Sequence, residues 1–180
     1  MADLLDFAGV VTPVTHTERN MLDALHVRYS QITPNSARRY AVAEHVRAAC
    51  GFSGWSALSD ARTMRTVDFM AQDTWEAQGL KLHGHEVKVS RSDWLTELKD
   101  PGKSEAVRRF CDRWWLVAPS KALVRDDLPD GWGLLVLDRA GRLRVAKSAP
   151  ALDPEPHPVT FRASLMRAVA KTAERRVGHG

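Results

Sequence analysis

The stretch GHEVKVSRSDW most constrains the fold, because it passes from a strand pattern directly into a helix start. Alternate residues of a β-strand face opposite sides of a sheet, so Val87 and Val89 would pack on one face. Glu86 and Lys88 would then share the other face. Ser90 stands where a helix N-cap is expected, with an acidic residue three positions later. The stretch therefore predicts a strand with one apolar face, followed at once by a helix.

The rest of the chain also mixes strand and helix patterns. Apolar residues at helical spacing follow Thr17, a candidate N-cap, and Pro101 occupies the first turn of a helix that Asp100 would cap. Residues 40–50 favour a helix by their alanine content and a strand by their alternation, and we favour the strand. Further strands are expected at 65–73, 80–90, 113–119 and in a hairpin over 132–149, and helices at 17–31, 90–99, 100–111 and 159–176.

A length of 180 residues fits one domain of ordinary size. Residues 1–16 show no clear period and are expected to form an N-terminal arm. The main domain would span residues 17–150. Residues 151–180 would form a proline-rich linker and a basic helix, since four prolines fall within nine residues around the start of this segment. Together the patterns predict an α/β fold with a mixed central sheet flanked by helices.

The charge of the chain favours polyanionic partners only slightly. Its 26 lysines and arginines against 22 acidic residues give a net charge of +4, a surplus that suits nucleic acid. The two cysteines are too few for a disulfide framework or a cysteine-based zinc site. No run approaches the roughly 18 apolar residues of a membrane span, and the N-terminus is acidic where a signal peptide would be basic. We therefore expect a cytoplasmic protein without a membrane partner.

A second acid, Asp68, lies in the strand expected just before the one that carries Glu86. If these strands are antiparallel neighbours, the two carboxylates can meet on one face of the sheet. Two carboxylates and a lysine suit a Mg²⁺ site that acts on a phosphodiester, with the Lys88 ammonium close to the attacked phosphate or the attacking water. On spacing alone, a solvated strand face or a cross-strand ion pair remains the commoner explanation of an acid-x-Lys pattern.

Asp68 is followed on the next strand by Glu86-Val87-Lys88, then by a helix and a further strand. This order resembles the PD-(D/E)xK nuclease superfamily. The longer run GHEVKVSRSDWLTELKDPGKSEAV, followed by CDRWWLVAP and LPDGWGLLVL, is similar to the branch of MmcB-type DNA-repair nucleases and their phage-encoded relatives. The similarity covers roughly residues 38–150. It implies a restriction-endonuclease-like core with the order α-β-β-β-α-β, here extended by a C-terminal hairpin and helix.

The resemblance also implies roles for individual residues. Asp68 and Glu86 match the metal-binding carboxylates of the superfamily, and Lys88 matches its catalytic lysine. The implied cofactor is Mg²⁺ or Mn²⁺ and the implied partner is DNA. Val67 stands where the name of the motif has a proline, which is often absent in the superfamily.

Many members of the superfamily use a further glutamate from the first helix or the first strand. Glu18 and Glu44 are the candidates here. Glu44 is the better of the two if its segment is a strand, because it would then share a face with Val42 and Val46. Resolvase-like relatives commonly work as dimers, so the resemblance is also consistent with a homodimer.

Four polar residues after the Glu-x-Lys pattern are candidates for contacts to DNA phosphates. Ser90 and Arg91 stand at a helix N-terminus, which favours anions, although a capping role already explains Ser90. Lys99 and Lys103 lie near a helix junction, where solvated lysines are the ordinary alternative.

The aromatic residues and histidines suggest little further chemistry. Trp75 lies in the polar connection QDTWEAQG and is the tryptophan that we expect to be exposed and available for base stacking. Trp94 and Trp132 are expected to pack in the core. The histidines show no zinc pattern, and we interpret His83 and His85 as surface or edge residues.

The sequence thus predicts a Mg²⁺- or Mn²⁺-dependent deoxyribonuclease of DNA repair, recombination or phage DNA processing. A non-catalytic nucleic-acid-binding module of the same fold is one alternative. A protein-interaction domain, in which Glu86 and Lys88 form a structural ion pair, is the other.

Overall fold

The computed structural model describes residues 15–49 and 65–177. Most of the expected N-terminal arm lies outside these residues, as does Cys50. The described elements, in chain order, are α1 (Glu18–Arg28), β1 (Tyr40–Arg47), β2 (Thr66–Asp73), the short 3₁₀ helix η2 (Glu76–Gln78), β3 (Leu82–Val87), α2 (Arg91–Leu98), α3 (Pro101–Arg108), β4 (Arg113–Ala118), α4 (Lys121–Val124), β5 (Gly133–Leu137), β6 (Leu143–Lys147) and α5 (Val159–Val177).

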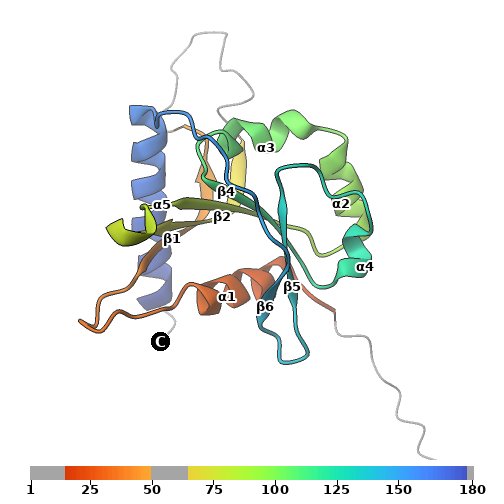
Figure 1. Ribbon diagram of the computed structural model, residues 1–180, viewed down its shortest axis with the longest axis horizontal. Coiled ribbons are helices and arrows are strands. Elements are labelled where there is room, and N and C mark those ends of the chain that lie inside the picture. Colours follow the sequence, from red (N-terminus) through yellow and green to blue (C-terminus); the bar gives the residue numbers. More distant parts are fainter. Residues whose placement is uncertain (1–14, 50–64, 178–180) are drawn as a thin grey trace, which may run out of the picture.

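The strands form one mixed sheet in the order β1-β2-β3-β4-β5-β6 (Figure 1). β1, β2 and β3 are antiparallel neighbours, β3, β4 and β5 run parallel, and β6 returns antiparallel to β5. The parallel step from β3 to β4 requires a crossover, which α2 and α3 supply. The predicted α/β class with a mixed sheet between helices is confirmed, and the elements follow the expected order from the first helix to β4.

Helices cover both faces of the sheet. On one face α1 packs its buried side chains Met21, Leu22 and Leu25 against Phe69 of β2 and neighbouring strand residues. On the other face, α2, α3, α4 and α5 contribute to a second hydrophobic cluster. This cluster contains Trp94 of α2 together with strand residues such as Leu116. The buried side chains of the sheet are thus shared between two cores, as expected for a layered α/β domain.

Local hydrogen bonds explain where α1 and α2 begin. Thr17 and Asn20 form a reciprocal capping box at the start of α1. The Ser90 hydroxyl accepts a hydrogen bond from the Asp93 N–H at 3.1 Å, which confirms the predicted N-cap of α2. Asp100 precedes α3 as expected but makes no capping hydrogen bond, because its carboxylate instead accepts a hydrogen bond from Arg65 at 2.9 Å.

The strand alternation of β1 breaks at His45, which has a positive φ of 52°. Few non-glycine residues adopt this conformation, and here it changes which side of the strand the next residue faces. Val42 and Glu44 lie towards α1, whereas Val46 belongs to the opposite cluster. The strand itself was predicted correctly, but the expected shared face of Glu44 and Val46 was wrong.

Aromatic packing makes use of the glycine in the GHEV segment. Trp94, Trp114 and Trp132 meet edge to face, and all three are buried. A β-carbon added at Gly84 would lie 2.4 Å from the Trp114 ring, so β3 can pass this ring only because it has no side chain there. The core positions predicted for Trp94 and Trp132 are confirmed.

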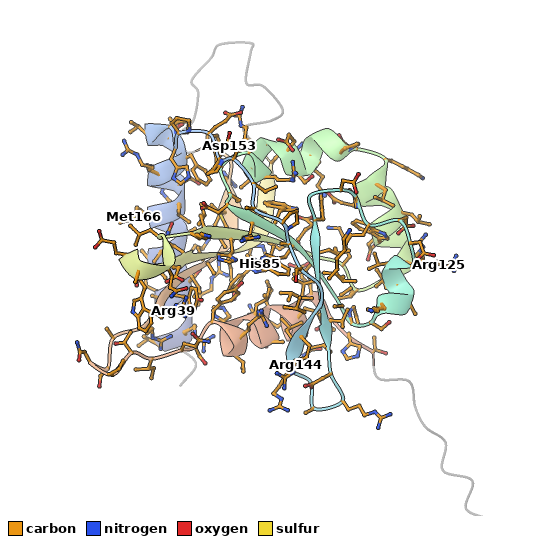
Figure 2. The ribbon with its side chains drawn as sticks, in the orientation of Figure 1. Arg39, His85, Arg125, Arg144, Asp153 and Met166 are labelled. Atoms are coloured by element: carbon orange, nitrogen blue, oxygen red, sulfur yellow. The ribbon has the colours of Figure 1, made fainter. Side chains whose placement is uncertain are left out.

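The histidine pair of β3 differs from its sequence interpretation. His85 is fully buried near the centre of the molecule (Figure 2), where it contacts the Tyr29 hydroxyl at 2.8 Å. The expectation that it lies at the surface or an edge was wrong, because β3 is an interior strand covered by α1. Burial lowers the pKa of His85 well below its usual value, so the ring is neutral.

The C-terminal segment returns to the first strand. After residues 151–158, which contain no helix or strand, α5 lies alongside β1 (Figure 1). Phe161 is buried, and the Thr172 hydroxyl accepts a hydrogen bond from the Glu44 N–H at 2.9 Å. Within the described ranges, no helix has the length and apolar character needed to cross a membrane.

Candidate functional site

The candidate site lies where β2 and β3 separate. Their backbone ladder ends at the pair Phe69 and His85, and the same register would place Asp68 opposite Glu86. Beyond this pair, Asp68 Oδ2 accepts a hydrogen bond from the Val87 N–H at 2.7 Å. A side-chain carboxylate thus takes the place of a backbone carbonyl, and it is held at the point where the strands diverge.

Glu86 and Lys88 form the centre of a short chain of charges. Lys88 Nζ lies 2.5 Å from a Glu86 carboxylate oxygen and 3.2 Å from Glu97 of α2. Glu97 in turn accepts a hydrogen bond from Lys103 at 2.8 Å. As the strand pattern predicts, Val87 and Val89 pack towards α1 while Glu86 and Lys88 face α2. Lys88 is only 11% exposed at its side chain, so its position is well defined by these contacts.

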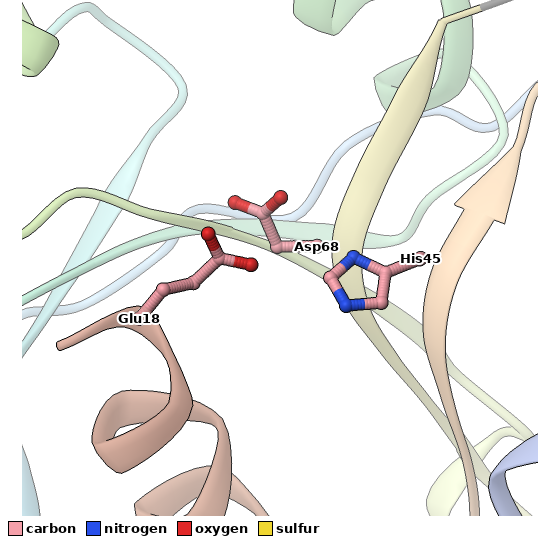
Figure 3. A group of neighbouring side chains, drawn as sticks. All are labelled: Glu18, His45 and Asp68. Carbon is pink, nitrogen blue, oxygen red and sulfur yellow. The ribbon is translucent and has the colours of Figure 1, made fainter.

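A second group of ligand atoms surrounds Asp68 from the side of α1 and β1. Glu18 stands in the first turn of α1. His45 lies between Glu44 and Val46 of β1, which pair with Phe69 and Val67 on either side of Asp68. One potential ligand atom from each of these three side chains lies within 4.8 Å of the others, and Figure 3 shows Glu18 and His45 converging on the Asp68 carboxylate. The structure therefore brings the candidate acid Glu18 to the site.

The other candidate acid, Glu44, is occupied elsewhere. Its carboxylate accepts a hydrogen bond from Arg19 at 2.7 Å and contacts His26 of α1 at 2.6 Å. Arg175 of α5 lies 3.3 Å from the same carboxylate. Glu44 therefore joins α1 and α5 to β1, and its side chain does not line the cleft that contains Asp68.

Charge and burial make the site unusual for ionisable groups. Burial raises the pKa of Asp68, an effect that the Lys88 ammonium and the Val87 N–H oppose. Burial and the nearby Asp68 carboxylate raise the pKa of Glu86 to about 8. Burial lowers the pKa of Lys88, but the carboxylates of Glu86 and Asp68 outweigh it and raise that pKa above its usual value. Desolvated carboxylates near one another favour a bound cation or proton.

The site opens into a cleft of about 430 Å³. Its lining includes Glu18, Arg65, Asp68, Glu86, Lys88 and Lys103. The cleft thus brings carboxylates and cations together, a combination that can hold a metal ion and an anionic group next to it.

The remaining candidate residues lie at different distances from this cleft. Lys103 lines it, whereas Lys99 caps the C-terminus of α2 and is exposed outside it. Ser90 caps α2. The Arg91 guanidinium donates hydrogen bonds to the Asp127 carboxylate and to carbonyl groups of α4, so its donors already have partners within the protein.

Trp75 lies beyond the opposite end of β2 from Asp68. Its side chain is exposed, at 38%, as the sequence predicts. The Arg39 guanidinium lies 5.0 Å from the centre of the ring, which is a cation–π contact. Trp75 does not line the cleft.

Two residues of the site were not identified from the sequence. His45 was grouped with histidines that show no pattern, and its positive φ has no signal in the sequence. Glu97 did have a signal, because it stands three residues after Trp94 and therefore shares the buried face of α2. One oxygen of Glu97 is buried without a hydrogen-bond partner in the described part of the chain.

Comparisons with known proteins support the fold alone. No family model and no curated protein matches the chain. The chain is similar to the solved structure of a protein of unknown function from Silicibacter pomeroyi, with a TM-score of 0.50 and 24% sequence identity over 77% of each chain.

Proposed function

We propose that this protein is a divalent-metal-dependent nuclease that hydrolyses phosphodiester bonds in DNA. The observation that carries the proposal is the arrangement of Asp68, Glu86 and Lys88 in one cleft at the fork of β2 and β3. The resemblance of the surrounding sequence to the PD-(D/E)xK superfamily supports DNA as the substrate and DNA repair, recombination or phage DNA processing as the setting.

The donor set fits a hard divalent cation. Asp68, Glu86 and Glu18 offer carboxylate oxygens, the ligands that Mg²⁺ and Mn²⁺ prefer. His45 adds an imidazole nitrogen, which suits Mn²⁺ better than Mg²⁺. When bound here, such a cation would polarise the phosphodiester and lower the pKa of a coordinated water.

Lys88 would act on the phosphate side of the site. Its ammonium is charged, because the surrounding carboxylates raise its pKa. The contacts to Glu86 and Glu97 hold the Lys88 amine in the cleft, where it can orient the attacking water and offset the charge that develops on the phosphate. Lys103 lies on the same side and would contact a neighbouring phosphate.

One observation favours a rival function. The close contact between Lys88 and Glu86 is also what a structural ion pair would show. In that case the protein would be a non-catalytic DNA-binding module or a protein-interaction domain. Removal of Lys88 would then lower stability without abolishing any activity on DNA.

A cleavage assay separates these functions. Single-stranded, duplex and branched DNA would be incubated with the protein and Mg²⁺ or Mn²⁺, with EDTA as the metal-free control. We expect cleavage that EDTA stops, and a loss of at least about a hundredfold in rate for Asp68→Asn, Glu86→Gln or Lys88→Met, since each change removes a group that acts on the reacting phosphate.

Matched controls come from exposed residues outside the cleft. Glu76→Gln, in η2, and Lys147→Met, at the end of β6, change the same charges and should cut at the wild-type rate. Cleavage that survives undiminished in Asp68→Asn and Glu86→Gln would contradict the assigned site. No cleavage with either metal, together with retained DNA binding, would instead favour the non-catalytic module.

A further inference from the structure

A basic groove lies between β1 and α5, next to the candidate site. Its volume is about 570 Å³. From α5 it is lined by Ser164, Arg167, Ala168, Lys171 and Arg175, whose spacing of three and four residues places them on one stripe of the helix. From the sheet it is lined by Glu44, His45, Arg47, Ala49 and Thr66, and the Glu44 carboxylate is already paired with Arg175. One helix face and one strand edge thus form the two walls.

Three cations of the groove have no partner among the residues that the structure describes. Arg47, Arg167 and Lys171 make no hydrogen bond or ion pair with any other residue that the structure describes. By contrast, Arg39 and Arg91 are each paired with a carboxylate. Glu44, which also lines the groove, is already paired with Arg19 and Arg175. The three other cations therefore repel one another, and a polyanion would relieve this repulsion.

The groove is continuous with the cleft that contains the candidate site. Thr66, at the start of β2, lines both the groove and the cleft. His45 lines the groove and also lies next to Asp68. An extended anion whose reacting group lies at Asp68 would therefore continue into the groove between β1 and α5.

We propose that this groove binds the phosphodiester backbone of duplex DNA beside the phosphate that is cut. The inference relies on the proposed function for the identity of the polyanion as DNA. Arg47, Arg167 and Lys171 would each neutralise a backbone phosphate. The sequence alone predicted only that the C-terminal helix is basic, whereas the tertiary structure places part of its basic surface next to the candidate site.

The groove is suited to phosphates rather than to bases. Proteins that bind single strands usually stack bases on large aromatic side chains, and no phenylalanine, tyrosine or tryptophan is among the described residues that line this groove. Contacts from arginine and lysine to phosphates carry no sequence information. Binding in the groove should therefore be independent of base sequence and strongly dependent on salt.

The test compares charge reversals on two faces of α5. Arg167→Glu and Lys171→Glu reverse charges in the groove. Arg162→Glu makes the same change on the same helix, but five residues from Arg167, which turns the two side chains roughly 140° apart. Arg162 is exposed and does not line the groove. Melting curves would confirm that all variants fold, and Arg47→Ala would test the strand wall of the groove.

Affinity would be measured for a fluorescein-labelled duplex by anisotropy, in EDTA and over a range of salt concentrations. We expect Arg167→Glu and Lys171→Glu each to weaken binding on the order of tenfold near 0.1 M salt and to reduce the slope of log K against log salt by about 1. Arg162→Glu should lose much less affinity for the duplex, because this change removes no direct phosphate contact.

The outcomes separate this inference from the nuclease proposal, because binding in EDTA does not depend on cleavage. The proposed role of the groove would be wrong if Arg167→Glu and Arg162→Glu lost equal affinity for the duplex. It would also be wrong if the wild-type protein did not bind the duplex. If only the groove variants lost affinity and the protein cut no DNA, the groove would stand as a DNA-binding site and the nuclease proposal would be wrong. If the protein cut DNA with metal but the groove variants kept their affinity, the nuclease proposal would be supported and the proposed role of the groove would be wrong.

Discussion

At the scale of single residues, we expect His45 to influence which metal the proposed site prefers. Its imidazole lies with two carboxylates, Glu18 and Asp68, around one position. A nitrogen ligand adds more to the affinity for Mn²⁺ than to that for Mg²⁺, which binds oxygen ligands almost exclusively in proteins. The backbone conformation of His45, with its positive φ, would thus affect which metal the proposed site prefers.

Removal of this imidazole should therefore affect the two metals differently. We expect His45→Ala to weaken Mn²⁺ binding about tenfold and Mg²⁺ binding much less. The thermal midpoint at increasing concentrations of each metal measures this effect, because a ligand that binds only the native state stabilises it. Mg²⁺ serves as the internal control. Unchanged binding of both metals would show that His45 contributes no ligand atom, and equal losses for both would contradict the expected preference for Mn²⁺.

At the scale of elements, the approach of β3 to β4 depends on Gly84. A methyl group at this position would lie 2.4 Å from the Trp114 ring and 3.0 Å from the Cys111 sulfur. Both neighbours are fully buried, so neither can move away without disturbing the core. The same strand carries Glu86, which means that packing at Gly84 also positions the candidate site.

Gly84→Ala should therefore lower the free energy of unfolding, by about 1–3 kcal/mol, because it overpacks the core. Gly102→Ala is the matched control. Gly102 is exposed in α3, where an added β-carbon would meet only an oxygen of Asp100 at 3.5 Å. This control should stabilise the protein by about 0.5–1 kcal/mol through helix propensity. Urea unfolding measures both, and an unchanged midpoint for Gly84→Ala would contradict the packing argument.

At the scale of the whole molecule, Glu44 links the two ends of the described chain to the sheet. It pairs with Arg19 and His26 of α1 and with Arg175 of α5. Burial would raise the pKa of this carboxyl, but the hydrogen bonds from Arg19 and His26 outweigh it and lower the pKa to about 2. A carboxyl with a lowered pKa stabilises the folded state as long as it is ionised.

This contribution has a defined pH window. It is fully present above the unfolded pKa of about 4.5 and is lost as the pH falls towards the folded value of about 2. Glu44→Gln should cost about 1–2 kcal/mol at neutral pH, discounted because Arg19 and Arg175 are about half exposed and screened by solvent. The stability of the variant should also depend less on pH below 4.5. Urea unfolding between pH 2 and 7 measures both effects, and parallel pH profiles for variant and wild type would contradict this role.

The elements and part of the candidate site could be predicted from the sequence. Helix starts at Thr17 and Ser90 follow from local capping chemistry, and the shared face of Glu86 and Lys88 follows from strand geometry. The meeting of Asp68 with Glu86 required one assumption, that β2 and β3 are antiparallel neighbours, and the structure confirms that pairing.

Other features had no local signal. The choice between Glu18 and Glu44 as the further acid depends on how α1 crosses the sheet. The sequence favoured Glu44 if its segment is a strand, whereas the structure brings Glu18 next to Asp68 and pairs Glu44 with Arg19. The pairing of Arg91 with Asp127 depends on a loop that folds back after β4.

By itself, the sequence determined the order of the six strands and of α1, α2, α3 and α5, the burial of one face of β3 and the presence of an acid and a lysine on the other, but not η2 or α4. These properties follow from dihedral preferences, side-chain alternation and caps that act over a few residues. Only the tertiary structure decided that Glu18 and His45 approach Asp68, and that α5 forms a groove with β1. Such contacts join residues far apart along the chain, so they depend on sheet register and helix packing, which no short stretch of sequence specifies.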